Sequence, residues 1–131
     1  MIYLKKYCAI VSVIYNIVHF AVPGEVEDLS LKPGSHNISV NWRKPTSNSY
    51  CVTQYVIHWS HPVNGSNVSS IDPSEENFNY SLVINDLDAC VEYEVSVIAE
   101  YEENQSTGAV TCNTTTETAG NYHAQIIVLY L

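Results

Sequence analysis

The sequence predicts an all-β fold, an antiparallel β-sandwich of seven strands, from three observations. Short runs of alternating apolar and polar residues recur along the chain, turn-forming residues separate them, and no stretch has helical periodicity. A spaced set of residues in and between these runs would face one core, namely Trp42, Tyr55, Leu87, Tyr93 and Thr116. The chain has 131 residues, of which 46% are hydrophobic, and this suffices for one domain with a single core.

The first 24 residues have the layout of a secretory signal peptide. Two lysines precede an apolar stretch over residues 7–22, and Val22-Pro23-Gly24 offers small residues for cleavage. The alternatives are an uncleaved membrane anchor and a buried helix. A spanning helix needs about 20 apolar residues, and Asn16 and His19 interrupt this stretch. We therefore assign residues 1–24 to a signal peptide and expect a secreted protein or the ectodomain of a membrane protein.

Cleavage would leave a strongly acidic domain. It removes two lysines and none of the 14 acidic residues. The cations that remain are Lys32, Arg43 and Lys44, so the formal net charge is 3 − 14 = −11. Nucleic acid and anionic membrane surfaces are poor partners for such a charge. We expect extracellular proteins as partners, no nucleic acid, and no membrane insertion by this chain alone.

N-glycosylation acceptors of the form Asn-x-Ser/Thr are frequent, and all of them follow the expected cleavage site. They are Asn37, Asn64, Asn67, Asn79, Asn104 and Asn113. A chain rich in Ser, Thr and Asn forms some of these triplets by composition alone, so each single site stays open. Behind a signal peptide, the set predicts a glycoprotein of the secretory pathway.

Several runs alternate clearly enough to be placed as strands. In one of them Ile38, Val40 and Trp42 share a face, which places Trp42 in the core. The clearest run begins at Glu92, where an apolar face alternates with an acidic one. The stretch 62–70, by contrast, is turn-rich and polar. The alternating runs cover residues 27–31, 37–42, 52–59, 79–84, 92–101 and 108–116.

These residues resemble the fibronectin type III domain, an immunoglobulin-like β-sandwich of seven antiparallel strands. The matching pattern consists of Asp28-Leu29-Ser30-Leu31, Ser39-Val40-Asn41-Trp42, Tyr55-Val56-Ile57, Leu87, the alternating run from Tyr93 to Ala99, and Thr114-Thr115-Thr116-Glu117. The resemblance assigns residues 26–117 to this domain and leaves residues 118–131 as a C-terminal tail or the start of a missing segment.

The most specific part of the resemblance is the pair Leu87 and Tyr93. It resembles the tyrosine corner, in which the hydroxyl of a Tyr at the start of a strand bonds to backbone just upstream. Trp42, Tyr55, Leu87 and Tyr93 are thus expected as structural residues of the sandwich.

The cysteine count is odd after cleavage, because Cys8 leaves with the signal peptide while Cys51, Cys90 and Cys112 remain. Cys51 and Cys90 resemble positions that often hold Cys in insect-type repeats, and such repeats occur in receptor tyrosine phosphatases and adhesion receptors. A disulfide between Cys51 and Cys90 does not fit this geometry. The two cysteines precede antiparallel strands, whose starts lie roughly 20 Å apart, whereas the Cα atoms of a disulfide are about 6 Å apart. We expect Cys112 to be a small buried residue. Cys51 and Cys90 would be exposed thiols or links to a disulfide-bonded or multidomain assembly.

No motif of catalysis or cofactor binding is present, so we expect neither an enzyme nor a cofactor. The sequence has no nucleophile elbow, phosphate-binding glycine loop, HExxH or CxxC. His58 and His61 are three residues apart near one strand and point to different faces, which argues against zinc. Asp86 and Asp88 flank Leu87, where turn formation is their ordinary role and a calcium site is the weaker interpretation. We expect no metal site.

Two surfaces are candidates for recognition of another protein. The first is a patch on the outward face of two strands, formed by Val56, His58, Glu94 and Ile98. Packing against an adjacent domain and ordinary exposure are its alternatives. The second is the pair of loops over residues 45–50 and 102–107, at one pole of the sandwich. Integrin binding through Arg-Gly-Asp is not supported, since that tripeptide is absent.

We therefore expect a secreted or cell-surface protein-binding module of the adhesion or receptor ectodomain type, without catalytic activity. This expectation rests on resemblance of fold, and one fold serves many functions. The alternatives are a soluble secreted binder or decoy and an accessory domain of a larger secreted enzyme.

Overall fold

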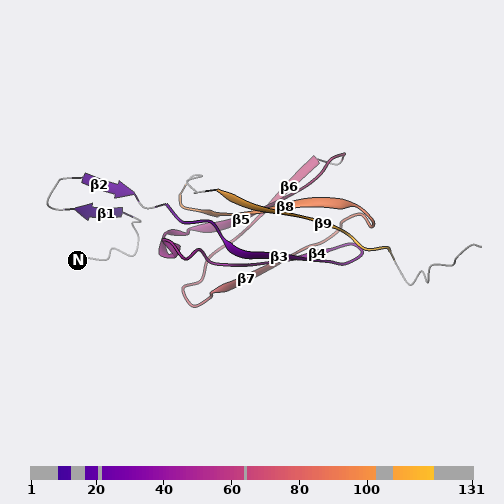
Figure 1. Cartoon of the computed structure of the whole chain (residues 1–131), viewed down its shortest axis with the longest axis horizontal. Coiled ribbons are helices and arrows are strands. Elements are labelled where there is room, and N and C mark those ends of the chain that lie inside the picture. The colour runs from indigo at the N-terminus through magenta and orange to yellow at the C-terminus, as the bar shows by residue number, and fades with distance from the viewer. Residues whose placement is uncertain (1–8, 13–16, 21, 64, 103–107, 120–131) are drawn as a thin grey trace, which may run out of the picture.

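Two antiparallel sheets form the body of the protein in the computed structural model (Figure 1). One sheet has the strand order β3-β4-β7 and the other the order β6-β5-β8-β9. The strands are β3 (Glu27–Pro33), β4 (Ile38–Arg43), β5 (Gln54–His61), β6 (Gly65–Ile71), β7 (Asn79–Ile84), β8 (Glu92–Glu100) and β9 (Ala109–Thr115). The structure describes residues 9–12, 17–20, 22–63, 65–102 and 108–119. The predicted all-β sandwich of seven antiparallel strands is confirmed.

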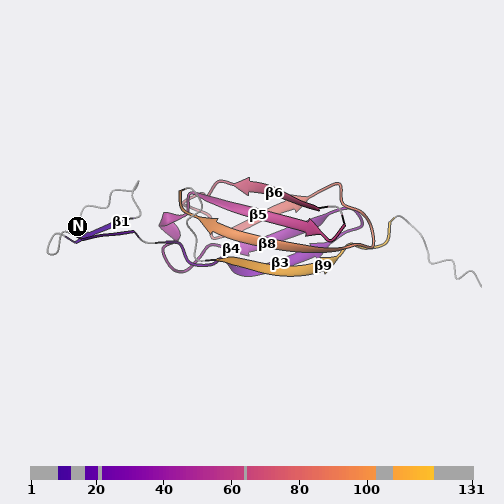
Figure 2. The ribbon, with the colours of Figure 1, turned by 90° about the horizontal axis from the view of Figure 1, so that it is seen from above.

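Two further short strands precede the sandwich. β1 (Ala9–Ser12) and β2 (Ile17–Phe20) form an antiparallel pair, which both views place beyond one end of the sandwich (Figures 1 and 2). They fall within the segment assigned to a signal peptide, whose cleavage stays a prediction. Most of the expected C-terminal tail, from residue 120 on, lies outside the described residues. Among the residues that the structure describes, no helix is long and apolar enough to cross a membrane.

The strand β6 corrects a prediction, because the sequence indicates only a polar turn region over residues 62–70. Gly65–Ile71 instead pairs with β5 along its whole length. β6 is an edge strand in which five of seven side chains are exposed. Because most of its side chains face solvent, β6 lacks the alternation of apolar and polar residues that identifies a half-buried strand. The sequence pattern therefore did not predict it.

Three aromatic rings from both sheets form the centre of the core. Trp42 in β4 and its register partner Tyr80 in β7 have ring centroids 6.0 Å apart. Tyr55 of β5 reaches across from the other sheet, to 4.5 Å from the ring of Tyr80 and 5.7 Å from that of Trp42. Burial raises the pKa of the Tyr55 hydroxyl, and the neighbouring Tyr80 adds to the effect. The rings bury large areas and join the two sheets.

One pole of the sandwich is tied by hydrogen bonds between segments far apart in the sequence. The N–H of Leu87 donates to the carbonyl of His36 at 3.0 Å, and the His36 ring nitrogen Nδ1 lies 2.9 Å from the Leu87 carbonyl oxygen. The hydroxyl of Ser35 donates to the carbonyl of Thr118, 83 residues later, at 2.8 Å. The turn after β3 is thus fastened to the turn before β8 and to the chain beyond β9.

Two side chains hold the turn between β7 and β8. The hydroxyl of Tyr93 accepts a hydrogen bond from the N–H of Asp88 at 3.0 Å, which is the geometry of a tyrosine corner. Thr116 is 3% exposed, and its hydroxyl donates to the Asp88 carbonyl at 2.6 Å and accepts from the Val91 N–H at 3.0 Å. The conformation of this turn therefore depends on residues that follow it in the chain.

Replacement of Tyr93 by Phe should lower the free energy of unfolding by about 1 kcal/mol or somewhat more, because the Asp88 N–H loses its partner. Urea denaturation followed by tryptophan fluorescence measures this change, and far-ultraviolet circular dichroism should show an unchanged fold. Tyr50→Phe is the matched control, since Tyr50 is 68% exposed and its hydroxyl should contribute little. Equal stability of the two variants would contradict the role assigned to Tyr93.

Candidate functional site

The predicted binding patch lies on the outer face of the sheet β6-β5-β8-β9. Val56 and Ile98 are register partners between β5 and β8. His58 lies in the next outward row along β5, and Glu94 lies one row further along β8, opposite Ser60. The structure therefore brings the four patch residues onto one face of two adjacent strands.

Val56 does not contribute to an exposed apolar surface. It is only 8% exposed, although Ile98 beside it is half-buried. In the neighbouring outward row, Nε2 of Gln54 donates to Oε2 of Glu100 at 2.7 Å, and Glu100 is also 8% exposed. The expectation that Val56 is exposed in the patch is therefore wrong.

The exposed part of this face is acidic and partly apolar. Glu92, Glu94 and His58 are exposed, and none of β5, β6, β8 and β9 contains Lys or Arg. Val68 of β6 is the register partner of His58 and is 59% exposed. Sequence reasoning missed Val68 because its strand lacks alternation. The face can offer carboxylates around a small apolar area to a partner.

A hollow of about 450 Å³ lies on the outer face of the other sheet. Its lining comes from β3, β4 and β7, and the residues are Asp28, Ser30, Asn41, Trp42, Arg43, Asn79, Tyr80 and Ser81. The prediction from sequence did not include this hollow, because its polar residues are spread over three strands and are adjacent only through the register of the sheet.

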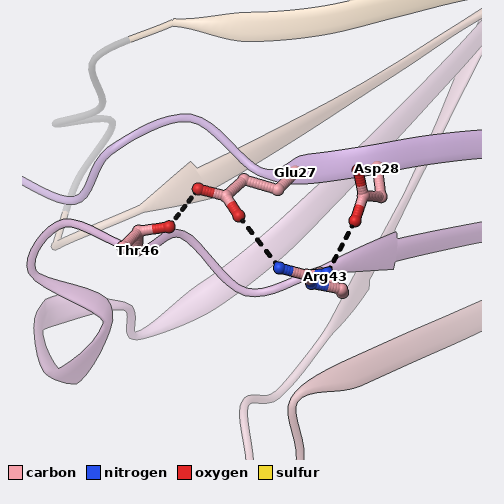
Figure 3. Close-up of polar contacts among 4 residues, drawn as sticks. All are labelled: Glu27, Asp28, Arg43 and Thr46. Atoms are coloured by element: carbon pink, nitrogen blue, oxygen red, sulfur yellow. Dashed lines mark hydrogen bonds and ion pairs between the residues drawn. The ribbon is translucent and has the colours of Figure 1, made fainter.

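Arg43 lines the hollow. It is also the centre of an ion-pair cluster (Figure 3). Its guanidinium lies 2.9 Å from Oδ2 of Asp28 and 3.4 Å from Oε2 of Glu27, and the hydroxyl of Thr46 donates to the other Glu27 oxygen. Consecutive side chains of a regular strand point to opposite faces. Here the register shifts between Glu27 and Ser30, and Asp28 has φ 50°, so that both carboxylates reach Arg43.

The cluster is a structural clamp between β3, β4 and the loop after β4. The hydrogen bond from Thr46 holds the pKa of Glu27 below its ordinary value of 4.5; desolvation opposes this shift, and the charge of Arg43 favours it. Because two carboxylates occupy the guanidinium, Arg43 is not an open anion receptor. All its partners are at least partly exposed, so the clamp contributes modestly to stability.

The loop over residues 45–50 is partly covered by residues 22–24 of the same chain. Nδ2 of Asn48 donates to the carbonyl of Val22 at 3.0 Å, and the N–H of Gly24 donates to the carbonyl of Ser47 at 2.9 Å. The segment that leads into β3 thus lies against this loop. Most of the second loop of the predicted pair falls outside the described residues.

The cysteines differ from one another in burial and bonding. Cys51 is the buried residue of the short 3₁₀ turn Ser49–Cys51, where it is 2% exposed and packs with Tyr101. Cys51 is also disulfide-bonded. The expectation of an exposed thiol at Cys51 is therefore wrong, whereas a bond from Cys51 to a neighbouring domain or chain stays a prediction. Cys90 is exposed and free, and Cys112 is half-buried and free.

Four of the six glycosylation acceptors fall within the described residues, and all four are exposed: Asn37, Asn67, Asn79 and Asn113. Asn64 and Asn104 lie outside the described residues. Asn79 lines the hollow, and Asn113 in β9 is the register partner of Glu94.

The candidate metal ligands lie apart from one another. His58 is exposed on β5, whereas the ring of His61 packs 5.7 Å from that of Tyr93. Asp86 has φ 58° in the turn before β8, where a short polar side chain tolerates this conformation. In the part of the chain that the structure describes, no three His, Cys, Asp or Glu side chains are grouped to hold a metal ion.

The family model of the fibronectin type III domain matches residues 24–112. The chain belongs to the fibronectin type III family. Domains of this family are common protein-binding modules of adhesion and receptor proteins and are generally non-catalytic. No curated protein sequence matches this fibronectin type III chain.

Solved structures resemble this fibronectin type III domain in fold. The fn3 domain of the human collagen alpha-1(XX) chain is 20% identical with a TM-score of 0.60, and the match covers 74% of this chain and 90% of that one. The FN5 domain of Drosophila Lar is 19% identical with a TM-score of 0.53, and the match covers 76% of this chain and 100% of that one. At such identities the likeness concerns the fold alone.

Glu27→Gln tests the clamp through its pH dependence. Because the folded-state pKa of Glu27 is lowered, its stabilising contribution is present above the unfolded-state pKa and is lost as the pH falls through the folded-state pKa. The variant should be less stable than the native protein at about pH 7, and the difference should shrink in acid, as the pH falls through the folded-state pKa of Glu27. Urea denaturation at neutral pH and along a series of acidic pH values measures it. Glu92→Gln, which removes an exposed charge from the other sheet, is the control, and a difference that persists in acid would contradict the clamp.

Proposed function

We propose that this fibronectin type III domain is a secreted or cell-surface protein-binding module of the adhesion or receptor ectodomain type, without catalytic activity. Family membership supports the binding role. The signal-peptide layout of residues 1–24 and the six glycosylation acceptors support the secretory route.

The observation that carries the proposal is the difference in charge between the two sheets. Lys32 and Arg43 lie in β3 and β4, and Lys44 follows β4 directly. The outer face of β6-β5-β8-β9 presents Glu92 and Glu94 and has no cation on any strand. Charge complementarity steers association and suppresses wrong partners. The acidic sheet face is therefore the surface that we assign to the partner.

The partner should present a basic surface with an apolar centre. The exposed carboxylates of Glu92 and Glu94 would pair with its Lys or Arg side chains, and half-buried Ile98 and exposed Val68 would meet its apolar residues. A central apolar area within a polar rim is the common arrangement of protein interfaces. His58 lies between the apolar and acidic parts and would be in contact with the partner.

Photo-crosslinking on intact cells tests the assignment of the face. A photoreactive phenylalanine analogue replaces His58 in one sample and exposed Ser30 of β3, on the opposite sheet face, in the control. We expect a saturable crosslink to one cell-surface protein from position 58 and none from position 30. Glu94→Lys should weaken binding by about tenfold or more, or about 1.4 kcal/mol. Equal crosslinking from both faces, or full binding by the Glu94 variant, would contradict the proposal.

The secretory route has a separate measurement. The intact mass of the protein recovered from the medium of eukaryotic cells should lack residues 1–24 and should fall further after enzymatic removal of N-glycans. A protein that is retained inside the cell with its first 24 residues intact and without sugar would contradict secretion.

A further inference from the structure

Two open sheets leave four edge strands, which are β3, β7, β6 and β9. An exposed edge pairs with strands of other chains unless charge, proline, a bulge or a covering segment prevents it. β3 carries the bulge at Asp28 together with Lys32 and Pro33. β9 lies beside β3 in both views (Figures 1 and 2). On this side of the sandwich, β9 therefore lies next to an edge strand that has a bulge, a charge and a proline.

The edges β6 and β7 lack the charge, the proline and the bulge that protect β3. Neither strand contains a charged residue or a proline, and each pairs with its neighbour without a register shift. Val68 in β6 is 59% exposed, and Val83 in β7 is 48% exposed. The run Tyr80–Ile84 combines high β-propensity with no charge, which is the composition of segments that assemble between chains.

Each of these two strands carries an exposed glycosylation acceptor. Asn67 lies in the middle of β6, with Ser69 two residues on, and Asn79 is the first residue of β7, with Ser81 two residues on. Asn79 and Ser81 also line the hollow, which leaves space for the first sugar. We propose that N-glycans on Asn67 and Asn79 shield the edges β6 and β7 and keep the domain monomeric.

The shield rests on the secretory route of the proposed function, because the sugar is transferred there. The side-chain nitrogen of Asn forms a bond to the anomeric carbon of an oligosaccharide carried on a lipid pyrophosphate. The lipid pyrophosphate leaves as that bond forms, and the amide proton passes to solvent. The attached glycan is large, hydrophilic and surface-bound, and it occupies the space that an incoming strand would need.

The remaining described acceptors serve as controls. Asn113 is exposed in β9, whose edge lies beside β3, and Asn37 lies in the turn between β3 and β4. Loss of sugar at either position uncovers no unprotected edge. Asn113→Gln is therefore matched to the edge variants in chemistry and in location on a strand, and it differs in the protection of that strand.

The experiment uses the full chain expressed in eukaryotic cells. Enzymatic deglycosylation in heavy-oxygen water, followed by peptide mass mapping, marks each occupied Asn, and light scattering gives the molar mass in solution. We expect occupied Asn67 and Asn79 and a monomer. The double variant Asn67→Gln, Asn79→Gln should shift to dimers and larger species, while Asn113→Gln stays monomeric and all variants keep the thermal midpoint of the native fold.

A rescue variant separates edge shielding from a loss of solubility. Addition of Val68→Lys and Val83→Lys to the double variant places a charge on each bare edge, which is the protection that natural edge strands commonly use. We expect this variant to return to a monomer without sugar at either edge.

The outcomes distinguish the shield from the secretory route. Empty Asn67 and Asn79 with sugar on Asn37 or Asn113, or a double variant that stays monomeric, would overturn the shield and leave the proposed function in place. Sugar at none of the acceptors would overturn both.

Discussion

The contact among the rings of Trp42, Tyr55 and Tyr80 is the constraint on which the rest of the structure depends. It joins β4 and β7 of one sheet to β5 of the other, and so fixes which side of each strand faces inward. Because side chains alternate, every neighbouring position then faces outward. The acidic face on one sheet and the hollow on the other both follow from the inward orientation of these three aromatic residues.

Alternation made most of the fold predictable. The strands β4 and β8 bury one face along most of their length, so their buried residues recur at every second position and could be predicted from the sequence. β6 could not be found in the same way. Its register with β5 is set by backbone hydrogen bonds, and its side chains remain largely in solvent, so its composition carries no period. The six alternating runs are one fewer than the seven expected strands, and β6 is the strand that they leave out.

The details of the surfaces were less predictable, because they depend on contacts between strands and not on position along one strand. Val56 has the outward parity of an exposed residue, yet it is buried beside the bond between Gln54 and Glu100. The bulge at Asp28 places two consecutive carboxylates on one arginine, against the alternation of a regular strand. Both features require the register of the sheet.

The hydrogen-bonded pole also sets an order of events in time. Ser35 bonds to Thr118, and His36 bonds to Leu87, so this pole cannot close during synthesis until almost the entire domain has left the ribosome. Contacts between residues so distant in sequence are costly in chain entropy and form late. On the proposed secretory route, the Asn-x-Ser/Thr triplets of the unclosed chain would then be open to the membrane-bound enzyme that transfers the sugar. Late closure of the sandwich would thus lengthen the interval in which the nascent chain is modified.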